Sequence, residues 1–133
     1  TGNQRLDPVR IEADGTKVFQ LEASIIDWEV SPGKTVKAWA YNKQVPGPWL
    51  RTEPNDKVKV EYTNNLPVSS DIHWHGVSTP FKMDGVAPIT QEAVKPGETF
   101  TYEWTNSNYA ELGMYHAHNH GQEAVVNGMF AAR

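Results

Sequence analysis

The chain has 133 residues, a length that fits one domain. Hydrophobic residues make up 38% and charged residues 21%, which excludes a disordered chain, and the net charge of -4 speaks against nucleic-acid binding. No apolar run approaches the roughly 18–20 residues that cross a bilayer, so no membrane segment is expected. No charged-then-apolar leader opens the chain, and we expect any export signal to have been removed or never to have existed.

Segments of alternating polar and apolar residues, separated by turn signals, predict strands along most of the chain. The predicted strands are 18–26, 35–41, 49–51, 57–64 and 99–104, with a last one beginning at 127. The histidine-bearing segments 72–76 and 113–120 are also interpreted as strands. No window of about 11 residues shows a helical period. Turns recur at roughly the 8–12-residue spacing of all-β sandwiches, so we expect one antiparallel, Greek-key-like β-sandwich.

Cysteine is absent from the sequence. This excludes disulfides, thiolate nucleophiles, zinc–thiolate and iron–sulfur sites, and a cysteine-ligated blue copper centre within these residues. Histidines, carboxylates, tyrosines or the backbone must therefore carry any chemistry.

All five histidines lie in two short clusters: His73 and His75, then His116, His118 and His120. Residues two apart on a strand point to one face, so each cluster presents its imidazoles together. If the two strands are neighbours, four or five imidazoles converge on one patch. Imidazole suits copper, zinc, iron and nickel, and two facing pairs could hold two or three ions. We therefore predict a metal site made by all five histidines.

Simpler interpretations stay open for several residues. A single His-x-His pair can be plain surface polarity, and His120 could be a ligand, a hydrogen-bond partner of a ligand or a solvated loop residue. Met83 and Met114 could be soft copper ligands, but core packing is the preferred interpretation. Trp74 and Tyr115 fall on the opposite strand face from the histidines, so both are expected in the core.

Two aspartates lie near the histidines in sequence. Asp84 could sit close to the cluster, although a turn before Gly85 explains it equally well. Asp71 could form a hydrogen bond to a ligand imidazole.

The segments His73-Trp74-His75-Gly76 and Tyr115-His116-Ala117-His118 resemble the two His-x-His motifs in the first domain of multicopper oxidases, a family that includes laccases and ascorbate oxidase. Further segments resemble signatures of the same family in consistent order: 45–48, 56–66, 83–91, 94–102 and 128–131. The resemblance runs from about residue 42 to residue 132.

The resemblance implies a cupredoxin fold, with residues 1–133 forming one plastocyanin-like domain whose last strand is cut short. It implies half of a trinuclear copper site, with His73 as a type 2 ligand and His75, His116 and His118 as type 3 ligands. In the family, another cupredoxin domain supplies the remaining histidines and the type 1 copper, and dioxygen is reduced to water. His120 has no counterpart among these ligands.

The resemblance also sets expectations about context. The chain alone should not be a complete oxidase, and it should pair with a second cupredoxin domain or form a homo-oligomer, with a trimer suspected from two-domain relatives. Such oxidases are usually secreted or periplasmic. Zinc could substitute for copper.

Two other functions stay open. The first is a non-catalytic metal-binding or self-assembling cupredoxin module, which a redox-silent, zinc-selective site would favour. The second is a mononuclear metal hydrolase or dismutase, for which no catalytic carboxylate lies at a clear spacing.

Overall fold

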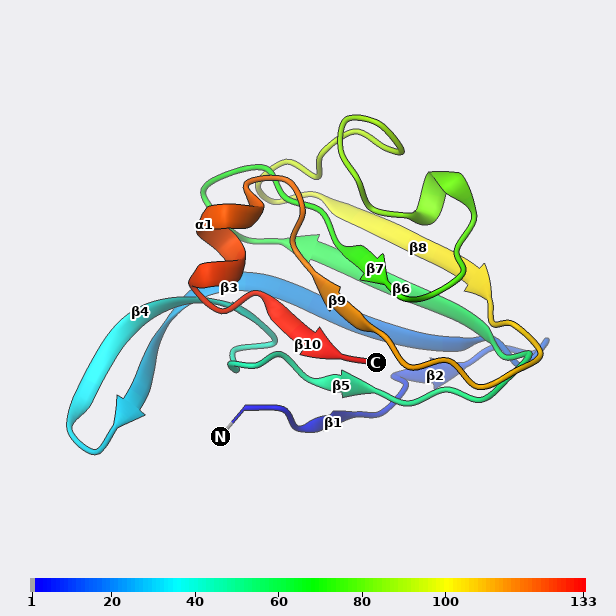
Figure 1. The fold of residues 1–133 in the computed structure, drawn as a ribbon, viewed down its shortest axis with the longest axis horizontal. Helices are drawn as coiled ribbons and strands as arrows, with labels where there is room; N and C mark the ends of the chain where they lie inside the picture. The colour runs from blue at the N-terminus through cyan, green and yellow to red at the C-terminus, as the bar shows by residue number, and fades with distance from the viewer. Residues whose placement is uncertain (1) are drawn as a thin grey trace.

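The computed structural model describes residues 2–133, and strands form most of its regular structure (Figure 1). The strands are β1 (Arg5–Leu6), β2 (Arg10–Ile11), β3 (Lys17–Ser31), β4 (Lys34–Tyr41), β5 (Trp49–Leu50), β6 (Lys57–Asn64), β7 (His73–His75), β8 (Thr99–Thr105), β9 (Met114–His116) and β10 (Phe130–Ala132). A 3-10 helix η1 (Phe81–Met83) and an α-helix α1 (Gly121–Val126) complete the elements. The all-β prediction is confirmed, but the expectation of a purely antiparallel arrangement is wrong, because β3 pairs with β6 in parallel. In the part of the chain described, no helix is long and apolar enough to cross a membrane.

Two sheets face each other across the core. The larger one has the order β2-β3-β6-β8, with β4 paired to β3, and the smaller one has the order β10-β9-β7. Strands β1 and β5 form a short parallel pair beside them. The smaller sheet lies in front of the larger one in Figure 1, and it carries the histidine motifs.

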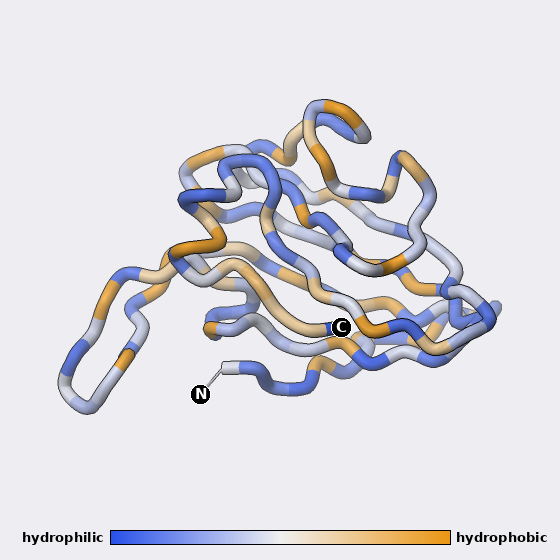
Figure 2. Tube along the Cα trace, in the orientation of Figure 1, coloured by the Kyte–Doolittle hydropathy of each residue, from blue (hydrophilic) through white to orange (hydrophobic). Residues whose placement is uncertain are grey.

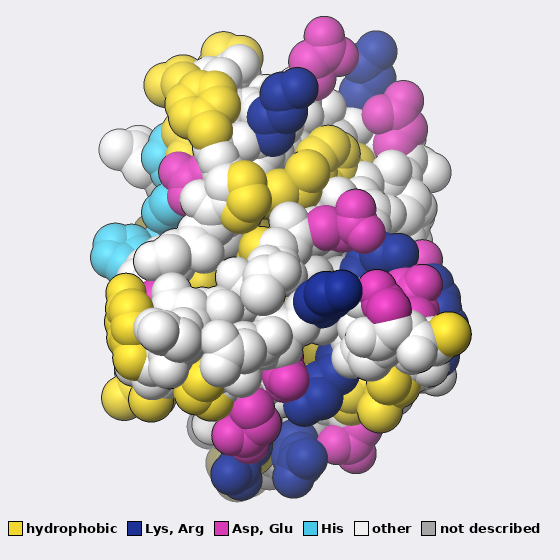
Figure 3. Space-filling model, turned by 90° about the vertical axis from the view of Figure 1, so that its right-hand side faces the viewer, with side chains coloured by type: hydrophobic (Ala, Val, Ile, Leu, Met, Phe, Trp, Pro, Cys, Tyr) yellow, Lys and Arg dark blue, Asp and Glu magenta, His cyan; other side chains and the backbone are white. Residues whose placement is uncertain are grey.

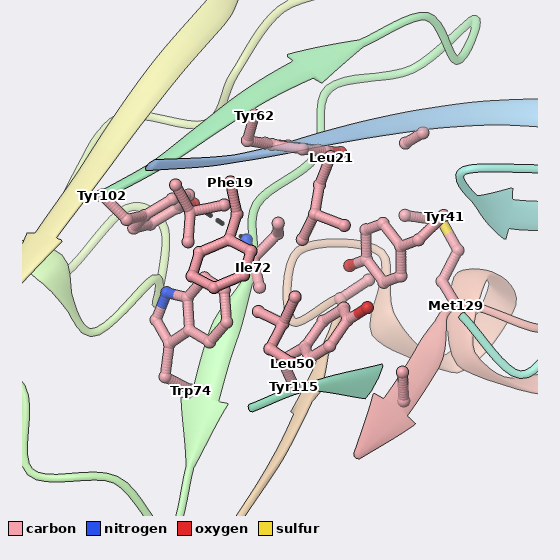
Figure 4. Packing of buried hydrophobic residues seen from close by; sticks show 14 of the residues in the cluster. Phe19, Leu21, Tyr41, Leu50, Tyr62, Ile72, Trp74, Tyr102, Tyr115 and Met129 are labelled. Carbon is pink, nitrogen blue, oxygen red and sulfur yellow. Dashed lines mark hydrogen bonds between the residues drawn. The ribbon is translucent and has the colours of Figure 1, made fainter. Parts of the chain in front are cut away.

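Alternation along the strands builds the core between the sheets. In β6 the residues facing inward are buried and those between them are half-buried or exposed, and Figure 2 shows hydrophobic and hydrophilic stretches mixed along the strands. The largest fully buried side chains come from both sheets and include Phe19, Tyr62, Tyr102, Trp74 and Tyr115. Figure 4 shows them packed together. This aromatic core is the rigid base on which the outer face of the smaller sheet stands.

The far ends of β3 and β4 form a hairpin arm that projects from the body, at the left of Figure 1. Its tip residues are mostly exposed. Ser31 pairs with Lys34 after a register shift, and Gly33 adopts a φ of 77° in the turn between the predicted strands 18–26 and 35–41.

Two expectations about elements are wrong. Segment 113–120 is not one strand, because β9 ends at His116 and the chain then turns. The helix α1 follows, where no helical period is visible, because six residues are too short to display one.

Candidate metal centre

Strands β7 and β9 are antiparallel neighbours, and their register determines which histidines meet. His73 lies directly opposite His116, and His75 lies opposite Met114. Directly opposed residues of an antiparallel pair project to the same face, so these four side chains share the outer face of the sheet. The predicted pairing of the two His-x-His strands is therefore present in the structure.

Three imidazoles form a tight group on this face. Ligand nitrogens of His73, His75 and His116 all lie within 4.8 Å of one another. The ring of His73 is central, with centroids 5.7 Å from His75, 5.3 Å from His116 and 5.8 Å from His118. Histidine side chains reach the surface at the left edge of Figure 3. The group is thus open to a ligand from solvent or from another polypeptide.

Backbone carbonyls orient two of these rings. Nδ1 of His73 lies 2.7 Å from the carbonyl oxygen of Asp84, and Nδ1 of His116 lies 3.0 Å from that of Ala117. A carbonyl only accepts, so each Nδ1 carries the proton and each Nε2 keeps a free lone pair. Metal-binding histidines typically show this arrangement, because the second nitrogen fixes the ring and its tautomer.

The environment of His116 favours the neutral imidazole. Burial lowers its pKa, the hydrogen bond to Ala117 opposes this, and the nearby rings of His73, His75 and His118 lower it further. A neutral imidazole is the form that binds a metal. Near neutral pH, His116 is therefore ready to donate its lone pair.

His118 and His120 reach different places from those that strand alternation predicts. His118 lies in the turn after β9, is exposed, and brings its ring beside His73 without a strand to carry it. His120 is the exposed N-cap residue of α1, with a left-handed φ of 55°. It is not among the three residues of the tight group.

The expectations for the neighbouring side chains had mixed outcomes. Trp74 and Tyr115 are in the core, as expected, with 1% and 0% exposure. Met83 packs against the core and its sulfur accepts the Glu103 N–H. Core packing is wrong for Met114, which is 41% exposed because the β7–β9 register puts it on the histidine face.

The two aspartates had different outcomes. The Asp84 carboxylate lies 3.7 Å from Nδ1 of His73, so this residue is close to the cluster as well as in a turn. The fully buried Asp71 forms its hydrogen bonds to backbone N–H groups and not to an imidazole. Its partners His118 and Asn119 lie 47 and 48 residues away, so no local pattern could reveal them.

The donor set fits copper or zinc. Three imidazole nitrogens converge, two rings are fixed by carbonyls, and no thiolate is available. Imidazole is a good ligand for copper and zinc, whereas magnesium and calcium prefer oxygen.

Comparison with known proteins decides between the metal-binding families. The family model for multicopper oxidases matches residues 22–133. The chain belongs to the multicopper oxidase family. This membership implies copper as the metal and confirms the resemblance that the histidine motifs indicate.

Individual multicopper oxidases agree with this assignment. The chain is 46% identical to the L-ascorbate oxidase of Cucurbita pepo var. melopepo over 104 residues, which is 75% of this chain and 18% of that protein. It is 33% identical to the laccase abr2 of Aspergillus fumigatus over 110 residues, which is 79% of this chain and 18% of that one. The solved structure of the multicopper oxidase from Campylobacter jejuni has a TM-score of 0.87 and 26% identity, covering 99% of this chain and 28% of that one.

These matches confirm the cupredoxin-like fold. They also show that the chain spans less than a fifth of the length of these two curated multicopper oxidases.

Proposed function

We propose that this chain supplies His73, His75, His116 and His118 to the trinuclear copper cluster of a laccase-like multicopper oxidase, where dioxygen is reduced to water. The observation that carries the proposal is the group of three nitrogens within 4.8 Å, with the ring of His118 beside it. Following the family motif, His73 is a type 2 ligand and the other three are type 3 ligands. Membership in an oxidase family favours this function over a non-catalytic module.

The residues of this chain have defined tasks in such a site. Asp84 and Ala117 hold the protons on Nδ1 of His73 and His116 through their carbonyls, which directs both Nε2 atoms outward. Trp74 fixes the strand between His73 and His75 from below, because its ring is locked in the core. Copper, when bound, supplies the one-electron chemistry that dioxygen reduction needs.

The remaining ligands and the electron supply must come from another polypeptide segment. The histidine face is open, and four imidazoles cannot complete a cluster of three ions with usual coordination numbers. A second cupredoxin domain, or copies of this chain in a trimer, would complete it. Since the sequence contains no cysteine, a cysteine-ligated type 1 copper must also lie elsewhere. We further propose an extracytoplasmic location for the assembled oxidase.

Copper content measured together with mass in solution tests the proposal. The chain is titrated with Cu²⁺, copper per chain is measured by elemental analysis, and light scattering gives the oligomeric state. We expect at least about one copper per chain with nitrogen hyperfine structure in the electron paramagnetic resonance spectrum. His73→Ala should abolish this signal, and His120→Asn should preserve it.

His120→Asn is the matched control because asparagine tolerates the left-handed backbone of residue 120. Copper uptake that is equal in the wild type and His73→Ala, or absent in both, would contradict the proposal. Tight, selective zinc binding without copper uptake would favour the non-catalytic module instead.

A further inference from the structure

A buried carboxylate connects the two histidine motifs. Asp71 lies two residues before His73, and its side chain is fully buried. Its Oδ1 accepts the backbone N–H groups of His118 and Asn119, both at 2.8 Å. Its Oδ2 accepts the N–H of Ala87 at 3.0 Å. Every acceptor atom of this carboxylate is thus directed at a backbone donor.

The turn at His118 depends on these bonds because it lies beyond the strand ladder. Strand β9 ends at His116, and the N–H of Ala117 already bonds to Met129 on another segment. Asn119 adds a second attachment, since its Nδ2 donates to the carbonyl oxygen of Ser69 at 3.3 Å and to its Oγ at 3.0 Å. The turn is therefore attached to the segment 69–71, which leads directly into β7.

This attachment places His118 relative to His73 without any direct contact between Asp71 and an imidazole. The segment that ends in His73 carries the carboxylate, and the carboxylate holds the backbone of His118. The two rings come to lie 5.8 Å apart between centroids as a result. A charged acceptor makes stronger hydrogen bonds to N–H groups than a neutral one, so the ion is well suited to hold a turn.

We propose that Asp71 is a positioning residue that places His118 for metal binding. The role in metal binding rests on the proposed copper function, whereas the placement of His118 by Asp71 also applies to the metal-free chain. Loss of the carboxylate should release the turn, leave the three-histidine group of His73, His75 and His116 in place, and remove the contribution of His118 to metal affinity.

The first test uses the metal-free chain. In Asp71→Ala, both side-chain oxygens are removed, so the backbone N–H groups of His118, Asn119 and Ala87 all lose their acceptor. We expect amide hydrogen exchange at His118 and Asn119 to become at least about tenfold faster in this variant. Exchange in β6 should stay unchanged. Unchanged protection at both amides would overturn the proposal.

The second test is a double-mutant cycle on Cu²⁺ affinity. Asp71→Ala should weaken copper binding by about 10–100-fold, the usual effect of losing a group that orients a ligand. In a His118→Ala background the same substitution should change affinity by less than about threefold, because the positioned side chain is already absent. An equal loss in both backgrounds would show a general structural role and contradict the proposal.

Two controls separate the possible failures. Asp56→Ala makes the same chemical change at another carboxylate that accepts a backbone N–H, and it should leave copper affinity unchanged. Asn119→Ala removes only the bonds to Ser69 and tests the same turn if Asp71→Ala does not fold. If the wild type binds no copper, the proposed function fails; if copper binding depends on His73 but not on Asp71, only the positioning role fails.

Discussion

Nδ1 of His73 donates a hydrogen bond to the carbonyl oxygen of Asp84, at 2.7 Å. The bond ties the centre of the histidine group to the segment after η1, which has no strand of its own. The backbone at Gly85, next to Asp84, passes close to the backbone of Ile72. This position therefore requires a residue without a side chain. A Cβ on Gly85 would lie 1.5 Å from the Ile72 carbonyl oxygen.

We expect Gly85→Ala to destabilise the protein severely and to impair copper binding. The added Cβ collides with the Ile72 backbone, and the φ of 71° is strained for alanine. Such a clash belongs to the exceptional class that costs more than about 4 kcal/mol of unfolding free energy. Urea unfolding monitored by tryptophan fluorescence measures the change.

Gly97→Ala is the matched control for this clash. Gly97 has a similar φ of 83°, but nothing lies within 4 Å of its added Cβ. Only the backbone strain of about 1–2 kcal/mol should remain. If the two variants lose equal stability, steric contact with Ile72 is not the reason for glycine at position 85.

Two buried tyrosines of the core should respond in opposite ways to loss of their hydroxyl groups. The Tyr115 hydroxyl donates to the carbonyl of Pro48, whereas the Tyr41 hydroxyl is buried with no hydrogen-bond partner among residues 2–133. Tyr115→Phe should cost about 1 kcal/mol, and it leaves the Pro48 carbonyl unpaired. Tyr41→Phe should be neutral or stabilise by up to about 1 kcal/mol, because it removes an unpaired polar group.

Chemical unfolding of both variants checks this pair. The ring centroids of Tyr41 and Tyr115 lie 5.3 Å apart, so both side chains share one packing environment. The two variants therefore serve as controls for each other. A loss of stability in Tyr41→Phe equal to that in Tyr115→Phe would show that the Tyr41 hydroxyl has a partner in solution.

Local patterns predict the parts of this fold that depend on alternation. The strand expected at 57–64 matches β6, and the inward Trp74 and Tyr115 follow from their positions between the histidines. The convergence of the two histidine motifs could be predicted only on the condition that β7 and β9 are neighbours, since nothing local in either motif identifies the neighbouring strand. The structure fulfils that condition with His73 opposite His116.

The remaining parts depend on contacts distant in sequence. The position of His118 is set by Asp71, 47 residues away, and therefore appears in no local period. Helix α1 is anchored by the bond from the Met129 N–H to the Ala124 carbonyl and by burial of Ala124. A prediction that extends strand alternation through residue 120 misses both the position of His118 and helix α1, because tertiary contacts override the local alternation.

Copper should stabilise the fold, and its removal should reverse the effect. A ligand that binds only the native state adds about 2.7 kcal/mol at a concentration 100 times its Kd. The proposed site joins β7, β9 and the following turn, so unfolding should release the ion. Thermal unfolding with and without Cu²⁺, and after a chelator, measures this gain. His73→Ala should show no comparable gain, and an equal shift in that variant would place the bound copper elsewhere.

Acid stability should depend on the ion pair of Asp56 with Lys17. Burial would raise the pKa of Asp56, but the hydrogen bonds from Lys17 and from the Glu53 backbone lower it below its usual value by more. The unfolded chain therefore binds more protons than the native protein around pH 4. The contribution of Asp56 is complete above that range and is lost as pH falls through the pKa of the folded state.

Asp56→Asn should accordingly destabilise the protein by about 0.5–1 kcal/mol at pH 7, with a smaller difference from the wild type below pH of about 3. Asp27→Asn is the control, because its ion pair with Lys37 is mostly exposed, at 66% and 74% of the two side chains. Exposed pairs contribute little, so that variant should stay within about 0.5 kcal/mol of the wild type. Urea unfolding of the three proteins at pH 7 and pH 3 makes the comparison. A constant gap between Asp56→Asn and the wild type at both pH values would contradict the lowered pKa.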